Sequence, residues 1–465
     1  MRIVIIGGGP GGYEAALVAA EHSSDVTLVS REGLGGNSVL WDSVPSKALI
    51  VSAQAMGWVQ SAHRLGVRLE GGGDAASSST VSMSAVMDRV QGLAFNQSAD
   101  INKKVEASGV RVVHGRGRLD GPRTVEVTDD EGAVGHLPAD VILLATGSNP
   151  RTLPFSVPDG ERVFTSRELY DLRVLPERLI VVGSGATGAE YAQAFAKFGS
   201  EVHLISSRDH ILPKEDPDAA SVIEDAFERW GMTIHRRRRA VDMQRGPDGV
   251  RVSVGDGEWV EGSHALYCIG QVPASDDLGL EGAGVAVNEG GDIPVDGVSR
   301  TSVPTIYAAG DLTGGTMLAS VAAMQGRNAM WHALGQAVAP LRRDTIAACI
   351  FTAPEVATVG ITAEQIPESH MPIETVTLAL AGNPRAKMAE HTEGFIKIHA
   401  MEGSGTVLGG AVVAVGASDL ITPLSVAVYN RLTVSQLAYA FSIYPSMGGS
   451  VQESARLMMA RLSDQ

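Results

Sequence analysis

The sequence predicts an α/β fold in which one strand–turn–helix pattern occurs twice and a separate α+β domain follows. Near the start, the apolar residues 3–6 run into a glycine-rich turn at 7–12 and then into a helical stretch. The same order returns at 179–182 and 183–188. Because the two copies lie far apart, they indicate a duplicated domain rather than a short repeat. From residue 342 onward no turn of this kind occurs.

Each copy continues as an alternation of strands and helices. In the first copy we expect helices to residue 21, at 46–63 and around 86–94, strands at 26–29, 110–113, 125–127 and 141–147, and a loop at 71–80. In the second we expect a helix to residue 198 and strands at 202–205 and 305–311.

Composition narrows the class of protein. A chain of 465 residues with 44% hydrophobic and 19% charged residues is long enough for about three globular domains. Its net charge of −16 argues against nucleic acid or anionic lipid as a partner. We interpret the basic run at 235–239 as a solvated edge strand, because no aromatic residues interleave with it.

Cysteine usage and the N-terminus suggest a location. Cys268 and Cys349 allow neither a disulfide framework nor a zinc cluster, so no metal site is predicted and a reducing cytoplasm is expected. Residues 1–6 are too short for a signal-peptide core. No stretch approaches the roughly 20 apolar residues of a membrane span, so no integral membrane association is expected.

The two glycine turns have the G-x-G-x-x-G pattern of dinucleotide-binding Rossmann folds, each between an apolar strand and a helix. The first glycine permits the tight turn, the second lets the backbone approach a diphosphate, and the third lets helix and strand pack. Two such turns predict two dinucleotides. Their glycines are Gly7, Gly9 and Gly12, followed by Gly183, Gly185 and Gly188.

Residues 35–47 carry a further pattern, GGNSVLWDSVPSK, and three other short turns follow at 145–147, 268–270 and 309–311. Together these motifs resemble, in order and over nearly the whole chain, the flavin-dependent disulfide reductases. The segment 351–360 looks like the opening of that family's C-terminal dimerisation domain.

The resemblance implies three domains and a homodimer. The FAD-binding domain would comprise 1–149 and 271–341, the NAD(P)-binding domain 150–270, and the dimerisation domain 342–465. It also implies cofactor-binding residues, with Asp311 on the ribityl chain of FAD and Lys47 and Glu190 as an ion pair beside the flavin. The other residues expected to bind FAD or NAD(P)H are Gly7, Gly9, Pro10, Gly12, Thr146, Gly147, Gly183, Gly185, Gly188 and Gly270.

The chain departs from this family where the redox chemistry lies. Ser38 and Ser43 occupy the positions of the two redox-active cysteines, and a hydroxyl can neither attack nor close a disulfide. The family's C-terminal histidine and glutamate, which manage thiol protons, are replaced by Tyr444 and Gly449. The disulfide half-reaction is therefore expected to be absent.

Two acidic residues that bind adenosine ribose are also missing. Ser30 stands at the first position, with Glu32 as the substitute, and Ser206 stands at the second, followed by Arg208. Without an acid, the 2′-phosphate of NADPH is not repelled and Arg208 is able to pair with it. NADPH is therefore the expected coenzyme, with NADH as a second one.

These features favour a cytoplasmic, FAD-dependent NAD(P)H:quinone oxidoreductase. The face left by the cysteines, with Ser38, Trp41, Ser43 and Tyr444 of the partner subunit, is the expected quinone slot, and Lys47, Glu190 and Tyr444 are the expected catalytic residues. Two alternatives stay open. One is a soluble pyridine nucleotide transhydrogenase, a family whose asparagine at this position Asn37 resembles, and the other is a non-catalytic FAD- and NAD(P)-binding redox sensor. The sequence leaves the physiological electron acceptor open.

Overall fold

The computed structural model describes residues 1–23, 25–67 and 79–463, so the loop expected at 71–80 lies almost wholly outside the described residues. The described chain forms two compact units. The first comprises 1–52, 81–174 and 270–341, and the second comprises the remainder. The mixed α/β class is confirmed, whereas the division into three domains stays a prediction.

The first unit is built on a parallel sheet with the strand order β18-β7-β1-β2-β3. These strands are β1 (Arg2–Ile6), β2 (Asp25–Ser30), β3 (Arg111–His114), β7 (Val141–Leu144) and β18 (Ile306–Ala308). Side chains alternate between the two faces of β1, where Ile3 and Ile5 belong to one core and Val4 and Ile6 to another. Both faces are therefore buried, as expected of a parallel sheet.

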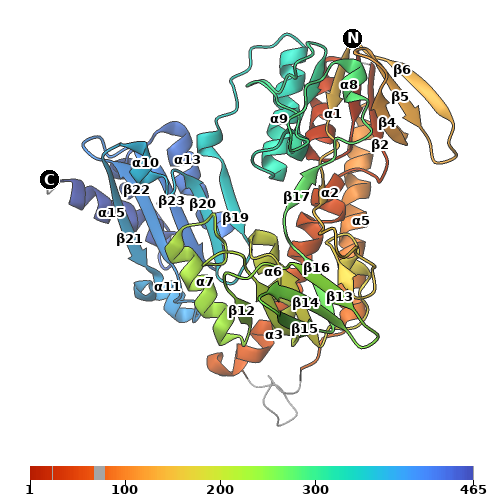
Figure 1. Ribbon diagram of the computed structural model, residues 1–465. Helices are drawn as coiled ribbons and strands as arrows, with labels where there is room; N and C mark the ends of the chain where they lie inside the picture. The colour runs from red at the N-terminus through yellow and green to blue at the C-terminus, as the bar shows by residue number, and fades with distance from the viewer. Residues whose placement is uncertain (24, 68–78, 464–465) are drawn as a thin grey trace. The chain divides into compact units, whose positions relative to one another are not determined.

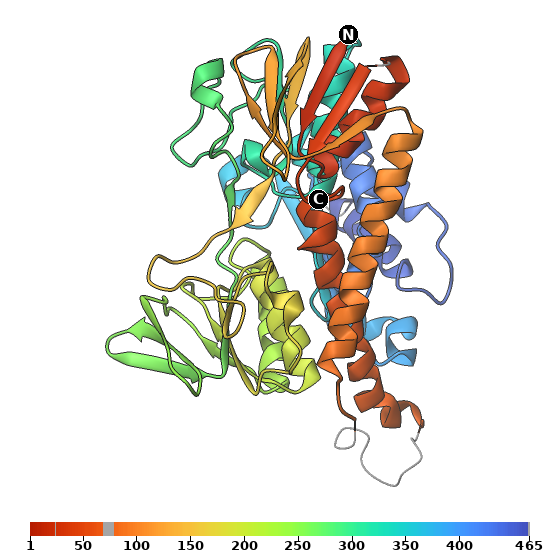
Figure 2. The ribbon, with the colours of Figure 1, turned by 90° about the vertical axis from the view of Figure 1, so that its right-hand side faces the viewer.

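Different elements cover the two faces. Helices α1 (Pro10–His22) and α9 (Ala319–Ala333) pack together on the side of Ile3 and Ile5. The antiparallel strands β4 (Arg116–Leu119), β5 (Thr124–Thr128) and β6 (Val134–Pro138) lie on the other side, in orange beside the red β1 (Figure 2). The other elements of this unit are α2 (Gly36–Leu40), α5 (Met83–Ala107), β8 (Ser148–Pro150), β9 (Val163–Phe164), η2 (Leu169–Asp171), β17 (Gln271–Pro273), α8 (Leu280–Ala283) and η3 (Gly310–Thr313). The helix α3 (Ser43–Ser61) begins in the first unit and ends in the second, to which η1 (Ala62–Leu65) belongs.

The second unit repeats the strand–turn–helix order. Parallel strands run in the order β12-β11-β10-β16, and α6 (Ala186–Phe198) follows β10. The bounds are β10 (Arg178–Val182), β11 (Glu201–Ile205), α7 (Pro217–Arg229), β12 (Thr233–His235), β13 (Asp242–Arg245), β14 (Val250–Gly255), β15 (Glu258–Gly262) and β16 (His264–Tyr267). The edge strand expected at 235–239 ends at His235, and the four arginines lie in the turn that follows it.

The last part of the second unit is an antiparallel sheet with the order β19-β20-β23-β22-β21, drawn in cyan to blue in Figure 1. Helices α13 and α15 pack on this sheet. The bounds are η4 (Arg343–Thr345), β19 (Ala347–Ile350), β20 (Glu355–Gly360), α10 (Ile366–Ser369), β21 (Ile373–Ala379), η5 (Leu380–Gly382), α11 (Pro384–Met388), β22 (Phe395–Met401), β23 (Val407–Ala414), α12 (Ala417–Leu420), α13 (Thr422–Asn430), α14 (Val434–Ala438) and α15 (Gly449–Ser463). Within the described residues, no helix is both long and apolar enough to cross a membrane.

Candidate functional site

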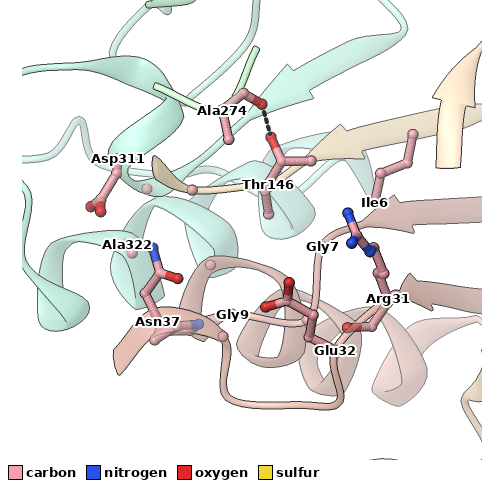
Figure 3. Close-up of a pocket in the computed structure, with 18 of the residues that line it drawn as sticks. Ile6, Gly7, Gly9, Arg31, Glu32, Asn37, Thr146, Ala274, Asp311 and Ala322 are labelled. Atoms are coloured by element: carbon pink, nitrogen blue, oxygen red, sulfur yellow. Dashed lines mark hydrogen bonds between the residues drawn. The ribbon is translucent and has the colours of Figure 1, made fainter. Parts of the chain in front are cut away.

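A cavity of about 370 Å³ lies at the carboxyl ends of β1, β2, β7 and β18 (Figure 3). Open α/β sheets bind their ligands at this edge. The predicted cofactor-binding residues that line it are Gly7, Gly9, Pro10, Glu32, Thr146, Gly147 and Asp311. Gly12 and Lys47 are not part of its wall.

The first glycine turn leaves room for a diphosphate. A Cβ at Gly7, where φ is 111°, would overlap the carbonyl oxygen of Ala145, and one at Gly12 would overlap that of Gly7. Gly9 is not crowded, because a Cβ there would make only an ordinary van der Waals contact, with the Cα of Gly36 at 3.9 Å. Gly9 is the N-cap of α1 and provides no side-chain cap, Pro10 has no N–H, and the N–H of Gly12 donates to the carbonyl oxygen of Gly9, so the N–H of Gly11 is the donor at the helix start that is left for an anion. The turn fits the diphosphate of FAD.

A chain of polar contacts holds the opposite wall of the cavity. The Ser148 hydroxyl donates a hydrogen bond to Oδ2 of Asp311 at 2.7 Å, and burial nonetheless raises the pKa of this carboxyl. Asn37 donates to the carbonyl oxygen of Ser148 at 2.6 Å. The Thr146 hydroxyl donates to the carbonyl oxygen of Ala274 at 2.8 Å, so Thr146 joins the turn after β7 to the segment after β17 (Figure 3).

The carboxylate of Glu32 is held by two donors. Trp41 donates from Nε1 at 3.0 Å, and the guanidinium of Arg167 lies 3.2 Å from Oε2. Arg167 also reaches the side-chain oxygens of Asn37 and Asn149, each at 3.4 Å. Arg167 lines the cavity, and our sequence reasoning missed it. No local motif marks it, since its partners are far away in the chain.

The wall of the cavity includes the two serines that stand at the cysteine positions. Ser38 and Ser43 both line the cavity, Ser38 on the short helix α2 and Ser43 at the start of α3. The Ser38 hydroxyl donates to the carbonyl oxygen of Gly35 at 2.9 Å. Trp41, also expected at this face, instead directs its ring nitrogen to Glu32. Ser30 donates to Gly33 at 2.7 Å.

Lys47 and Glu190 belong to different units, and their predicted ion pair stays a prediction. Lys47 lies on α3, one turn after Ser43. Glu190 is buried on α6, and its Oε1 accepts a hydrogen bond from the backbone N–H of Phe351 at 2.8 Å. Tyr444 lies between α14 and α15, with 83% of its surface exposed.

The second glycine turn has the same geometry as the first. Gly183 has a φ of 111°, and a Cβ there would overlap the carbonyl oxygen of Cys268. A Cβ at Gly188 would overlap the carbonyl oxygen of Gly183, whereas one at Gly185 would meet nothing within 4 Å. The turn therefore fits a second dinucleotide at the start of α6. Gly270, another predicted ligand, follows β16 with a φ of 95°.

The end of β11 carries the predicted selectivity residues. Ser206 is fully buried and accepts a hydrogen bond from the Ser184 hydroxyl at 2.7 Å, which joins β11 to the glycine turn. Arg208 is exposed two residues later.

Comparison with known proteins identifies relatives over the full length. The chain is 47% identical over 468 residues to an NAD(P)H dehydrogenase (quinone) of Mycobacterium tuberculosis, covering 99% of this chain and 94% of the relative. It is 32% identical over 457 residues to a dihydrolipoyl dehydrogenase of Chlorobaculum tepidum, with 97% and 96% covered. The crystal structure of LpdA from M. tuberculosis superposes with a TM-score of 0.93 at 46% identity, over 99% of this chain and 100% of that one.

Family matches cover most of the chain. Residues 1–326 match the pyridine nucleotide-disulphide oxidoreductases, and residues 346–455 match the dimerisation domain of the same family. The chain therefore belongs to the pyridine nucleotide-disulphide oxidoreductase family and is a flavoprotein oxidoreductase that binds FAD and a pyridine nucleotide.

Proposed function

We propose that this protein is an NAD(P)H:quinone oxidoreductase that works without a disulfide relay. The observation that carries the proposal is the presence of Ser38 and Ser43 on the cavity wall, where a disulfide reductase needs a thiol pair. Neither Cys268 nor Cys349 lines this cavity. The relative at 47% identity, named NAD(P)H dehydrogenase (quinone), supports the same reaction.

FAD would be held by the first glycine turn, Glu32 and Asp311. When bound, the flavin supplies a two-electron carrier that takes hydride from NAD(P)H and reduces a quinone to its hydroquinone with the uptake of protons. The protein would hold the flavin in position and supply charged and polar side chains beside it. Lys47 places a cation at the start of α3, Glu190 balances it, and Tyr444 of the partner subunit offers a phenol to the acceptor.

NADPH is the proposed coenzyme, because the second glycine turn is followed by Ser206 and Arg208 instead of an acidic residue. An NADH preference would require a carboxylate at the ribose hydroxyls, and the buried Ser206 does not offer one.

Anaerobic stopped-flow absorbance tests the proposal. The purified holoenzyme is mixed first with NADPH and then with a naphthoquinone. We expect rapid bleaching, reoxidation by quinone, and no charge-transfer band from a thiolate to the flavin. Reoxidation by NAD⁺ but not by quinone would replace the proposal with a transhydrogenase, and flavin that NADPH never bleaches would leave a redox sensor.

A further inference from the structure

The arginine run 236–239 lies against the predicted NADPH site, although about thirty residues separate the two in sequence. The run follows β12, which pairs with β11 in the parallel sheet. The backbone N–H of Arg238 donates to the carbonyl oxygen of Ser206 at 2.8 Å, and that of Arg237 donates to the carbonyl oxygen of Arg208 at 3.0 Å. These two bonds fasten the turn to the end of β11.

The end of β11 is where a dinucleotide-binding fold recognises the 2′ position of the adenosine ribose. The Ser206 hydroxyl faces inward, toward the Ser184 hydroxyl and the carbonyl oxygen of Arg208. It is fully buried and offers nothing to a ligand outside the sheet. Recognition of a 2′-phosphate therefore falls to side chains that project beyond the strand end.

The arginines of the turn differ in their partners. Arg236 pairs with Glu224 and Glu228. Arg238 likewise pairs with two carboxylates, those of Asp256 and Glu258. Two carboxylates on each of these guanidinium groups leave little for a ligand.

Arg237 is held more weakly. Its guanidinium pairs with Asp209, and 77% of the arginine side chain and 61% of the aspartate side chain are exposed. Exposed ion pairs contribute little to stability, so a phosphate is able to displace the carboxylate of Asp209. Arg237 also has a φ of 55°, a backbone conformation that side chains of this size seldom adopt. This backbone conformation suits a glycine better than an arginine.

We propose that Arg237 is a second ligand of the 2′-phosphate, acting together with Arg208, and that Asp209 holds Arg237 when the coenzyme lacks this phosphate. The inference rests on the proposed use of NADPH. A phosphate monoester carries more negative charge than a carboxylate and accepts two parallel N–H bonds from a guanidinium. Arg237 therefore exchanges the carboxylate of Asp209 for the 2′-phosphate, which binds a guanidinium more strongly.

Calorimetric titration of the holoenzyme tests this without turnover. The ligands are adenosine 2′,5′-bisphosphate and 5′-AMP, which differ by the 2′-phosphate. For Arg237→Ala we expect at least tenfold weaker binding of the bisphosphate and less than twofold change for 5′-AMP. Arg237→Gly, which suits the positive φ, should give the same result and separates recognition from folding.

Arg239→Ala is the matched control, because it removes the same charge from an exposed neighbour in the same turn. We expect it to change the selectivity less than twofold. Equal effects of the two alanine variants, or equal weakening of both ligands by Arg237→Ala, would overturn the inference. If Arg208→Ala weakens the bisphosphate selectively and Arg237→Ala does not, Arg237 is refuted as a second ligand while NADPH use stands. If neither variant weakens the bisphosphate more than 5′-AMP, both proposals fail.

Discussion

The carboxylate of Glu190 accepts a hydrogen bond from the backbone N–H of Phe351 at 2.8 Å. One turn along the same helix, the side-chain oxygen of Gln193 accepts from the N–H of Ala353. One face of α6 therefore holds the chain just after β19. Glu190 has a structural role besides its proposed charge beside Lys47, and the two roles are separable.

Replacing Glu190 by glutamine should keep this bond and remove the charge, whereas alanine removes both. We expect Glu190→Ala to lower the free energy of unfolding by about 1–3 kcal/mol, because the Phe351 N–H loses its acceptor. Glu190→Gln should cost clearly less while slowing flavin reduction by NADPH. Denaturant unfolding and stopped-flow bleaching measure the two effects; equal destabilisation by both variants would show that charge alone matters.

Arg167→Met should weaken FAD binding about tenfold, because it removes the guanidinium that holds Glu32 and Asn37. A hydrogen bond to a charged group contributes about 1.5 kcal/mol, which corresponds to this factor. Titration of the apoprotein, followed by quenching of flavin fluorescence, measures the affinity. Arg173→Met is the control, because Arg173 pairs with Asp88 at the surface of the same unit. Comparable losses in both variants would exclude a specific role for Arg167.

Alanine at Gly9 and at Gly12 should act differently. A methyl group at Gly9 makes only an ordinary van der Waals contact with Gly36, so the apoprotein should keep its stability within about 0.5 kcal/mol. FAD affinity should fall, because the methyl group would occupy the proposed place of the diphosphate. At Gly12 the methyl overlaps the Gly7 carbonyl, and stability should fall by about 2–3 kcal/mol or more. Thermal unfolding of both apoproteins measures the stability, and titration with FAD measures the affinity. Unimpaired FAD binding by Gly9→Ala would place the diphosphate elsewhere.

Stability should fall in mild acid because of His399. Burial and then the charge of Lys397 lower the pKa of His399 from 6.5 to about 4. Between these two pH values the unfolded chain binds the additional proton, so stability declines as pH falls through this window, by at most about 3 kcal/mol. Above pH 6.5 the residue has no effect.

Unfolding of wild type and His399→Gln between pH 7 and pH 4 measures this contribution, with His136→Gln as the control because 53% of the His136 side chain is exposed. The His399 variant should show a flatter pH profile than the other two proteins. Three parallel profiles would mean that His399 accepts its proton in the folded state at an ordinary pH.

Features formed by neighbouring residues could be predicted from the sequence. The two glycine turns depend on steric demands within a few residues, and Gly7 and Gly183 have the positive φ that these turns require. The buried strands depend on short apolar runs, and β10 covers Arg178–Val182 where 179–182 is expected. The serine replacements at positions 38 and 43 needed only a motif to reveal them. The boundaries were less certain: the helix expected at 46–63 is α3, Ser43–Ser61.

Contacts between distant segments were decided only by the tertiary structure. Ser148 meets Asp311 because the parallel strands β7 and β18 end at one edge of a sheet. Arg167 reaches Glu32 from the segment between β9 and η2, which is outside this sheet. Arg237 lies beside Arg208 because β12 pairs with β11. Strand order is set by the packing of whole faces, which no local pattern encodes. The sequence by itself thus determined the two glycine turns and the serines that stand at the cysteine positions, because both are local patterns, and the fold decided which polar side chains surround them.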